Sequence, residues 1–145
     1  MAITAKWYPN GFKGAMNKEL DFESDPIKVM LLDDTYEIDL SNHAYVSDLE
    51  GEVEGDGYDE GGIELTGRLV SYNSPSQVLK LDADDAVWNM LRVTFRYAVI
   101  YNDEGETAEE KLLLGYIDFG DDVELHGDKF TMIWDSEGLL NIDLS

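Results

Sequence analysis

The chain has 145 residues, of which 32 are Asp or Glu and 10 are Lys or Arg, giving a formal net charge of −22. A polyanion of this density repels nucleic acid and anionic membrane surfaces, so we expect neither as a partner. Hydrophobic residues make up 43% of the chain, too many for a disordered acidic tail, and the length suits one folded domain over residues 1–145. The lack of cysteine in the sequence excludes disulfides, thiolate nucleophiles and cysteine-ligated zinc.

The charge is divided unevenly along the chain. Residues 1–18 contain no acid and carry Lys6, Lys13 and Lys18, a sum of +3, whereas the remaining residues carry seven bases and all 32 acids, a sum of −25. We interpret residues 1–20 as a cationic attachment segment and the rest as an acidic body. The N-terminus lacks the continuous apolar core of a signal peptide, and no stretch approaches the ~20 apolar residues of a membrane span. We therefore expect a soluble protein made without export.

The first predicted element is a short helix over residues 9–20. Phe12, Met16 and Leu20 recur at every fourth position and would share one face of this helix. The apolar run 27–32 has the length of a buried strand. Further on, Ser41 and Asn42 could cap a short helical turn that reaches Leu49.

The rest of the chain is typical of strands separated by turns. Residues 48–64 hold eight acids and five glycines, which predicts a loop with at most one edge strand. Strands are predicted over 69–72 and 78–81, with a turn at 73–76 between them, and the strongest strand pattern lies over 93–101. Three more strands are predicted over 112–119, 130–134 and 139–144. This pattern predicts a mainly β, antiparallel sandwich or barrel of about seven to eight strands, with the short helix across one end.

Few residues are candidates for catalysis or metal binding. The only histidines, His43 and His126, stand beside turn-forming residues, and we interpret them as loop residues. The acid clusters at 56–60 and 82–85 lack the D-x-D-x-D-G spacing and the distal Glu of a calcium loop. The sequence therefore predicts a protein that is not an enzyme and that has no catalytic residue, metal site or cofactor.

The aromatic pair Trp7-Tyr8 stands between Lys6 and Pro9, ahead of the predicted elements. Aromatic side chains beside positive charge are common at interface hot spots. Partner contacts are predicted for five residues of this segment, namely Lys6, Trp7, Tyr8, Phe12 and Lys13. The sequence leaves an alternative open, in which Trp7 and Tyr8 belong to the first strand and core of the protein itself.

A family resemblance is carried by stretches that agree in order and spacing. These are residues 4–8 with the helix through 17, 27–31, 52–58 with 61–62, 81–85 with Trp88, 96–101, 115–120 and 130–135. In them the chain resembles small virion structural proteins of tailed phages, of the head decoration or head fibre type. The chain is more acidic than that family, especially at 48–64 and 103–110, which suits a saline habitat, where the screening length falls to ~3 Å at 1 M salt.

The resemblance implies a capsid decoration protein on the outer shell of a tailed phage or virus. It also implies two partners, the major capsid protein and other copies of this chain, and a location on the capsid exterior after synthesis in the host cytoplasm. A tail or neck component is the first alternative. A second alternative follows from the fold class, because β-sandwiches also host carbohydrate-binding and calcium-dependent adhesion modules.

Overall fold

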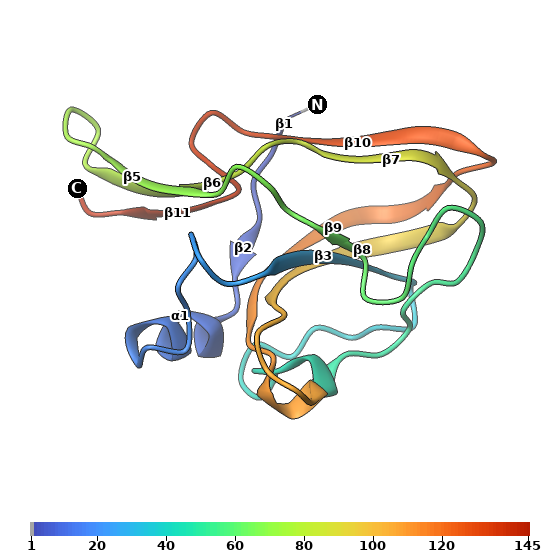
Figure 1. Cartoon of the computed structure of the whole chain (residues 1–145), viewed down its shortest axis with the longest axis horizontal. Coiled ribbons are helices and arrows are strands. Elements are labelled where there is room, and N and C mark those ends of the chain that lie inside the picture. The colour runs from blue at the N-terminus through green and yellow to red at the C-terminus, as the bar shows by residue number, and fades with distance from the viewer. Residues whose placement is uncertain (1) are drawn as a thin grey trace.

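The computed structural model describes residues 2–145 and shows a mainly β, antiparallel sandwich with one short α-helix (Figure 1). The strands are β1 (Ala2–Ile3), β2 (Lys6–Trp7), β3 (Ile27–Leu32), β4 (Ile63–Glu64), β5 (Leu69–Asn73), β6 (Val78–Asp82), β7 (Ala86–Leu91), β8 (Thr94–Asn102), β9 (Leu113–Glu124), β10 (Asp128–Trp134) and β11 (Leu140–Asp143). The helix α1 spans Pro9–Met16, and two 3₁₀ turns span Val46–Asp48 and Ala108–Glu110. Eight of these strands have four or more residues, in agreement with the predicted number.

Two layers make up the sandwich. One layer is a five-stranded sheet in the order β2-β9-β8-β3-β4. The other layer consists of two three-stranded sheets, β11-β6-β5 and β1-β10-β7, which follow one another along the long axis in Figure 1. The pairing of β1 with β10 is parallel, and the other strand pairs are antiparallel.

The five-stranded sheet is buried on both faces, because its strands alternate between two apolar clusters. Along β8, Ala98 belongs to the main core between the two layers, whereas Val99 and Tyr101 belong to a second cluster on the opposite face. The segment 33–50 covers this second cluster with Tyr36, which is 2% exposed. Burial on both faces explains why β3 and β8 are nearly continuous apolar runs.

The helix α1 is shorter than predicted and buries a different face. It ends at Met16, whose side chain is 73% exposed, so the predicted stripe through Phe12, Met16 and Leu20 is not the packing face. The buried residues of α1 are Gly11 and Gly14. Glycine lets a helix approach a sheet closely because it has no Cβ, and a hydrophobic period cannot reveal such a face.

Two other local predictions differ from the structure. The strand β7 was not predicted, and Trp88 lies within it, paired with Phe130 of β10. The helical turn predicted from Ser41 is only the 3₁₀ turn Val46–Asp48, and the side chain of Asp48 caps it by accepting hydrogen bonds from the backbone N–H groups before the turn. No helix within residues 2–145 has the length and apolar character needed to cross a membrane.

Candidate functional site

The structure places the aromatic pair of the N-terminal segment in the body of the protein. Trp7 lies in β2 opposite Gly115 of β9, is half-buried, and donates a hydrogen bond from Nε1 to the carbonyl oxygen of Asn141 at 3.1 Å. Tyr8 is 0% exposed. Both residues therefore belong to the protein's own first strand and core, which was the alternative interpretation, and Tyr8 has no surface to offer a partner.

The other predicted contact residues keep more of their surface. Lys6 in β2 and Lys13 in α1 are exposed, and Phe12 is half-buried with its ring edge-on to Trp7 at a centroid distance of 5.3 Å. Lys6 also borders a hollow of about 440 Å³ lined in part by Leu40. The N-terminal segment thus presents three cations, Lys6, Lys13 and Lys18, and part of the Phe12 ring, while Trp7 and Tyr8 hold it to the body.

A chain of hydrogen bonds connects Tyr8 to the surface through two residues of the segment 33–50. The hydroxyl groups of Tyr8 and Tyr36 lie 2.8 Å apart, and the Tyr36 hydroxyl lies 2.9 Å from Nδ1 of His43. The backbone N–H of Asp39 donates to the same Nδ1 at 3.4 Å, which assigns Nδ1 as an acceptor and places the ring proton on Nε2. Tyr36 then donates to His43, and Tyr8 donates to Tyr36.

Burial controls the protonation of these two phenols. Burial raises the pKa of Tyr36 to about 12, and it raises the pKa of Tyr8 well above its usual range. Both hydroxyls therefore stay protonated at neutral pH and act as hydrogen-bond donors. No local pattern in the sequence indicates this arrangement, because Tyr8 and Tyr36 are 28 positions apart.

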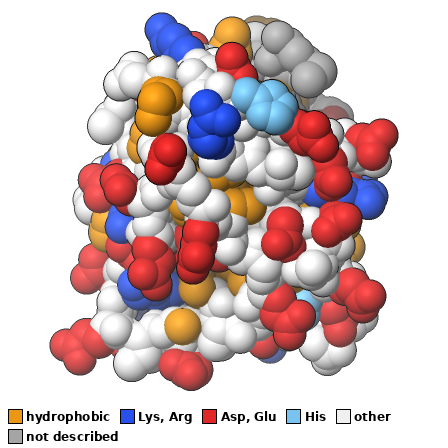
Figure 2. All heavy atoms as spheres, turned by 90° about the vertical axis from the view of Figure 1, so that its right-hand side faces the viewer, with side chains coloured by type: hydrophobic (Ala, Val, Ile, Leu, Met, Phe, Trp, Pro, Cys, Tyr) orange, Lys and Arg blue, Asp and Glu red, His pale blue; other side chains and the backbone are white. Residues whose placement is uncertain are grey.

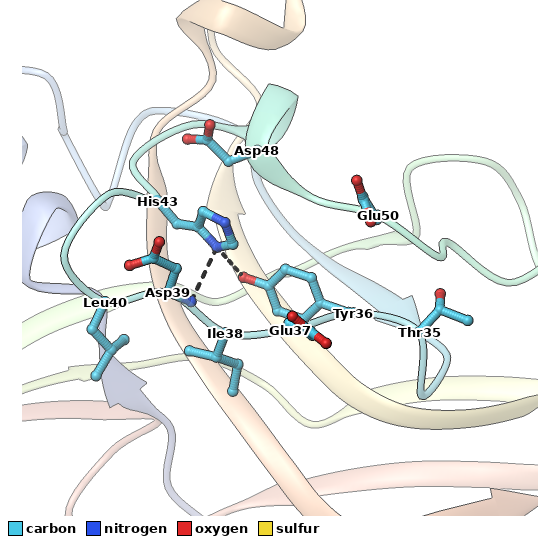
Figure 3. A pocket seen from close by; sticks show the side chains of 9 residues that line it. All are labelled: Thr35, Tyr36, Glu37, Ile38, Asp39, Leu40, His43, Asp48 and Glu50. Atoms are coloured by element: carbon cyan, nitrogen blue, oxygen red, sulfur yellow. Dashed lines mark hydrogen bonds between the residues drawn. The ribbon is translucent and has the colours of Figure 1, made fainter.

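His43 lies at an open pocket of about 700 Å³ on the segment 33–50 (Figure 3). Four carboxylates line the pocket with it, those of Glu37, Asp39, Asp48 and Glu50. Two of these carboxylates stabilise the local backbone. Asp39 accepts hydrogen bonds from the Asn42 side chain and from nearby backbone N–H groups, and these lower its pKa, while Asp48 caps the 3₁₀ turn.

This pocket offers limited chemistry. Nδ1 of His43 already accepts two hydrogen bonds, so the ring presents only its Nε2–H. The one aliphatic hydroxyl among the residues that line the pocket is that of Thr35, and it donates to the carboxylate of Asp33 rather than to His43. Within residues 2–145, no three His, Asp or Glu side chains are grouped to hold a metal ion. Two acids of the cluster at 82–85 serve the fold, since Asp84 accepts a hydrogen bond from the hydroxyl of Thr66 and Asp85 accepts one from the backbone N–H of Trp134.

The best-defined electrostatic feature is an ion-pair cluster at Asp103, just after β8. Its two carboxylate oxygens lie 3.0 Å from Lys28 Nζ and 2.7 Å from Lys111 Nζ. Burial raises the pKa of Asp103, but the two ammonium groups outweigh burial, and the pKa lies below its usual value. Among residues 2–145 there is one further ion pair, between Arg96 and Asp118, so only two carboxylates of the chain have a cationic partner there.

Most of the large exposed apolar side chains lie in the part of the molecule that carries α1 and β5. Figure 2 faces the end of the molecule that is opposite α1 and β5, and it shows many scattered Asp and Glu side chains with few apolar ones. Five of the eight large apolar side chains that are exposed within the described chain belong to α1, to β5 or to the end of β11, namely Met16, Leu69, Val70, Tyr72 and Leu144.

No family model, characterised protein or solved structure matches this chain.

Proposed function

We propose that this protein is a non-enzymatic structural protein of a tailed-phage virion, bound to the outside of the capsid in many copies. The proposal rests on the resemblance in sequence and on one structural observation that supports it. Residues 1–18 carry no acid, and α1, on the same side of the molecule as β5, presents Lys13 and the exposed Met16, while the opposite end presents carboxylates (Figures 1 and 2).

This asymmetry gives the molecule a surface for attachment and a surface for solvent. Cations beside exposed apolar groups suit an acidic protein surface with apolar patches, because charge steers the approach and burial of apolar area holds the complex. The acidic end would repel other acidic proteins and keep the particle exterior hydrated. The partner that fits the N-terminal segment is therefore the acidic exterior of the capsid formed by the major capsid protein.

Reattachment to capsids stripped of this protein tests the proposal. We expect Lys13→Glu and Met16→Ser to fold with a wild-type melting temperature and to bind stripped capsids at least tenfold more weakly, since each removes an exposed contact. Lys129→Glu and Ile133→Ser are the matched controls, because these residues are exposed on β10, and they should bind normally. Binding by all four variants like wild type would show that attachment does not use the N-terminal segment.

The number of copies per particle separates the head from the tail. A capsid decoration protein should be present in hundreds of copies, whereas a tail or neck component is present in a few dozen or fewer. Quantitative mass spectrometry of purified particles measures this number directly. Absence of the protein from the particles would overturn the virion role altogether.

A further inference from the structure

The strand β5 has one edge that pairs with no other strand. It pairs with β6 on one side, in a register without a bulge that sets Ser71 opposite Lys80 and Tyr72 opposite Leu79. The backbone N–H of Val70 points away from β6, because it donates to Oε2 of Glu23 at 3.0 Å. Backbone direction alternates along a strand, so the N–H and C=O of Tyr72 also point outward, and among residues 2–145 they have no hydrogen-bond partner.

The outer edges of the other strands are not available in this way. The strands β1, β2 and β4 have two residues each. The stretches of β9 and β10 that β2 and β1 leave unpaired, 117–124 and 128–132, carry five acids, and charged side chains along an edge disfavour the addition of a strand. Beside β7, Gly57 packs so closely on the carbonyl group of Met90 that a Cβ would overlap it. Beside β11, the carbonyl oxygen of Asn141 already accepts a hydrogen bond from the indole N–H of Trp7. The edge of β5 is therefore the place where a further strand can add.

The side chains exposed along this edge are apolar, and the residues around it carry no acid of their own. Leu69, Val70 and Tyr72 are 55%, 38% and 52% exposed. Residues 65–81 contain no acid, in a chain of net charge −22, and carry Arg68 and Lys80. Arg68 donates to three backbone carbonyls and has no carboxylate within 4.0 Å among residues 2–145.

A second copy of this chain is a partner that fits this edge. Two copies repel one another through their acidic surfaces, and they repel least where both present the acid-free residues 65–81, although the carboxylate of Glu23 is bonded to this edge. The edge is also self-complementary. With a two-fold axis beside Tyr72, the Tyr72 N–H of each copy can donate to the Tyr72 C=O of the other, and Glu23 keeps its hydrogen bond to Val70.

We propose that two copies of this protein associate by antiparallel pairing of β5 with β5, which joins their β11-β6-β5 sheets across a two-fold axis. The edge is short, so the association is weak in solution. It strengthens with salt, because the screening length falls from ~10 Å at 0.1 M to ~3 Å at 1 M. Attachment to a capsid through charge should instead weaken as salt is added. Self-association and capsid attachment can therefore be tested separately.

Sedimentation velocity of the full chain in 1 M sodium chloride tests the pairing. Between about 10 µM and about 1 mM, a range that covers dissociation constants typical of small interfaces, the monomer should convert to dimer, with less dimer at 0.1 M salt. Hydrogen exchange at the Tyr72 amide should slow as dimer forms. A monomer at every concentration, or a dimer that leaves this amide unprotected, would overturn the proposal.

Variants at the edge make the test specific. Tyr72→Pro removes the outward N–H without removing a bond to β6, and proline is accepted on edge strands, so it should raise the dissociation constant at least tenfold. Val70→Lys, which keeps the backbone donor but places a charge at the edge, should do the same and serves if the proline variant does not fold. Leu69→Ala is the control, because Leu69 is equally exposed but faces the other side of the sheet, and it should dimerise like wild type. Equal dimerisation of the edge variants and the control would refute pairing through β5.

Discussion

Replacement of Gly11 by alanine tests how the N-terminal segment is held on the body. Gly11 is buried in α1, and a Cβ at this position would overlap the carbonyl oxygen of Leu113 in β9. Backbone atoms of a central strand cannot move aside, so the helix would have to lift from the sheet. Trp7 and Tyr8 immediately precede this helix, so their packing depends on the same close approach.

The expected cost follows from two opposing effects. Overpacking of this kind destabilises by about 1–3 kcal/mol or more, whereas alanine stabilises a helix interior by about 1 kcal/mol relative to glycine. We expect a net loss of about 2 kcal/mol in the free energy of unfolding. In a chain of this size that corresponds to roughly 6 °C in melting temperature.

Gly14→Ala is the matched control within the same helix. A Cβ at Gly14 would lie 2.7 Å from Cδ1 of Leu112, and this side chain can turn away. The steric cost should then nearly cancel the gain in helix propensity, and stability should change by less than about 1 kcal/mol. Urea unfolding followed by tryptophan fluorescence measures both variants. Equal stability of Gly11→Ala and wild type would show that α1 does not dock on β9 through its glycine face.

Three further predictions concern the N-terminal strand and the charges. Trp7→Ala should lower the free energy of unfolding by about 2–3 kcal/mol, since a half-buried indole is lost, and an unchanged melting temperature would restore its role as an exposed contact. Asp103→Asn should cost about 1 kcal/mol at pH 7, because Lys28 and Lys111 lose their shared partner. Because the pKa of Asp103 is lowered in the fold, this stabilisation is complete above its unfolded pKa of ~3.9 and disappears as the pH falls below that value. The melting temperatures of wild type and variant should therefore converge in acid. A difference that stays constant with pH would contradict the lowered pKa of Asp103. For the wild type, the melting temperature should rise from low salt to 1 M sodium chloride, because most carboxylates within residues 2–145 have no cationic partner and salt screens their mutual repulsion. A flat or falling melting temperature would mean that the fold already offsets the repulsion among these carboxylates.

The parts of the fold that the sequence predicted are those in which a local pattern agrees with the final packing. The strand β3 coincides with the predicted 27–32, because six mostly apolar residues are buried on both faces of the sheet. The hairpin of β5 and β6 follows from turn residues between two apolar runs. In contrast, β7 alternates poorly, with Asn89 and Met90 both exposed, and it is a strand because β10 pairs with it.

The features of the candidate site that escaped prediction depend on distant residues. The two histidines were placed in loops, as observed, but nothing near His43 in sequence shows that Tyr36 and the buried Tyr8 lie in line with it. The ion-pair cluster at Asp103 likewise unites Asp103, which follows β8, with Lys28 in β3 and with Lys111, which precedes β9, and only the sheet brings these residues together.

The tyrosines explain how so acidic a chain can satisfy its carboxylates with few cations. An ionised carboxylate only accepts hydrogen bonds, and with ten Lys and Arg for 32 acids the donors must come from elsewhere. Tyr58 donates to Glu52 and Tyr45 donates to Glu19, each at 2.7 Å, and the same Glu52 oxygen accepts from the backbone N–H of Gly61. Hydrogen bonds from neutral donors are less weakened by salt than ion pairs are. A fold built on them loses little in concentrated salt, where the repulsion among its exposed carboxylates also falls.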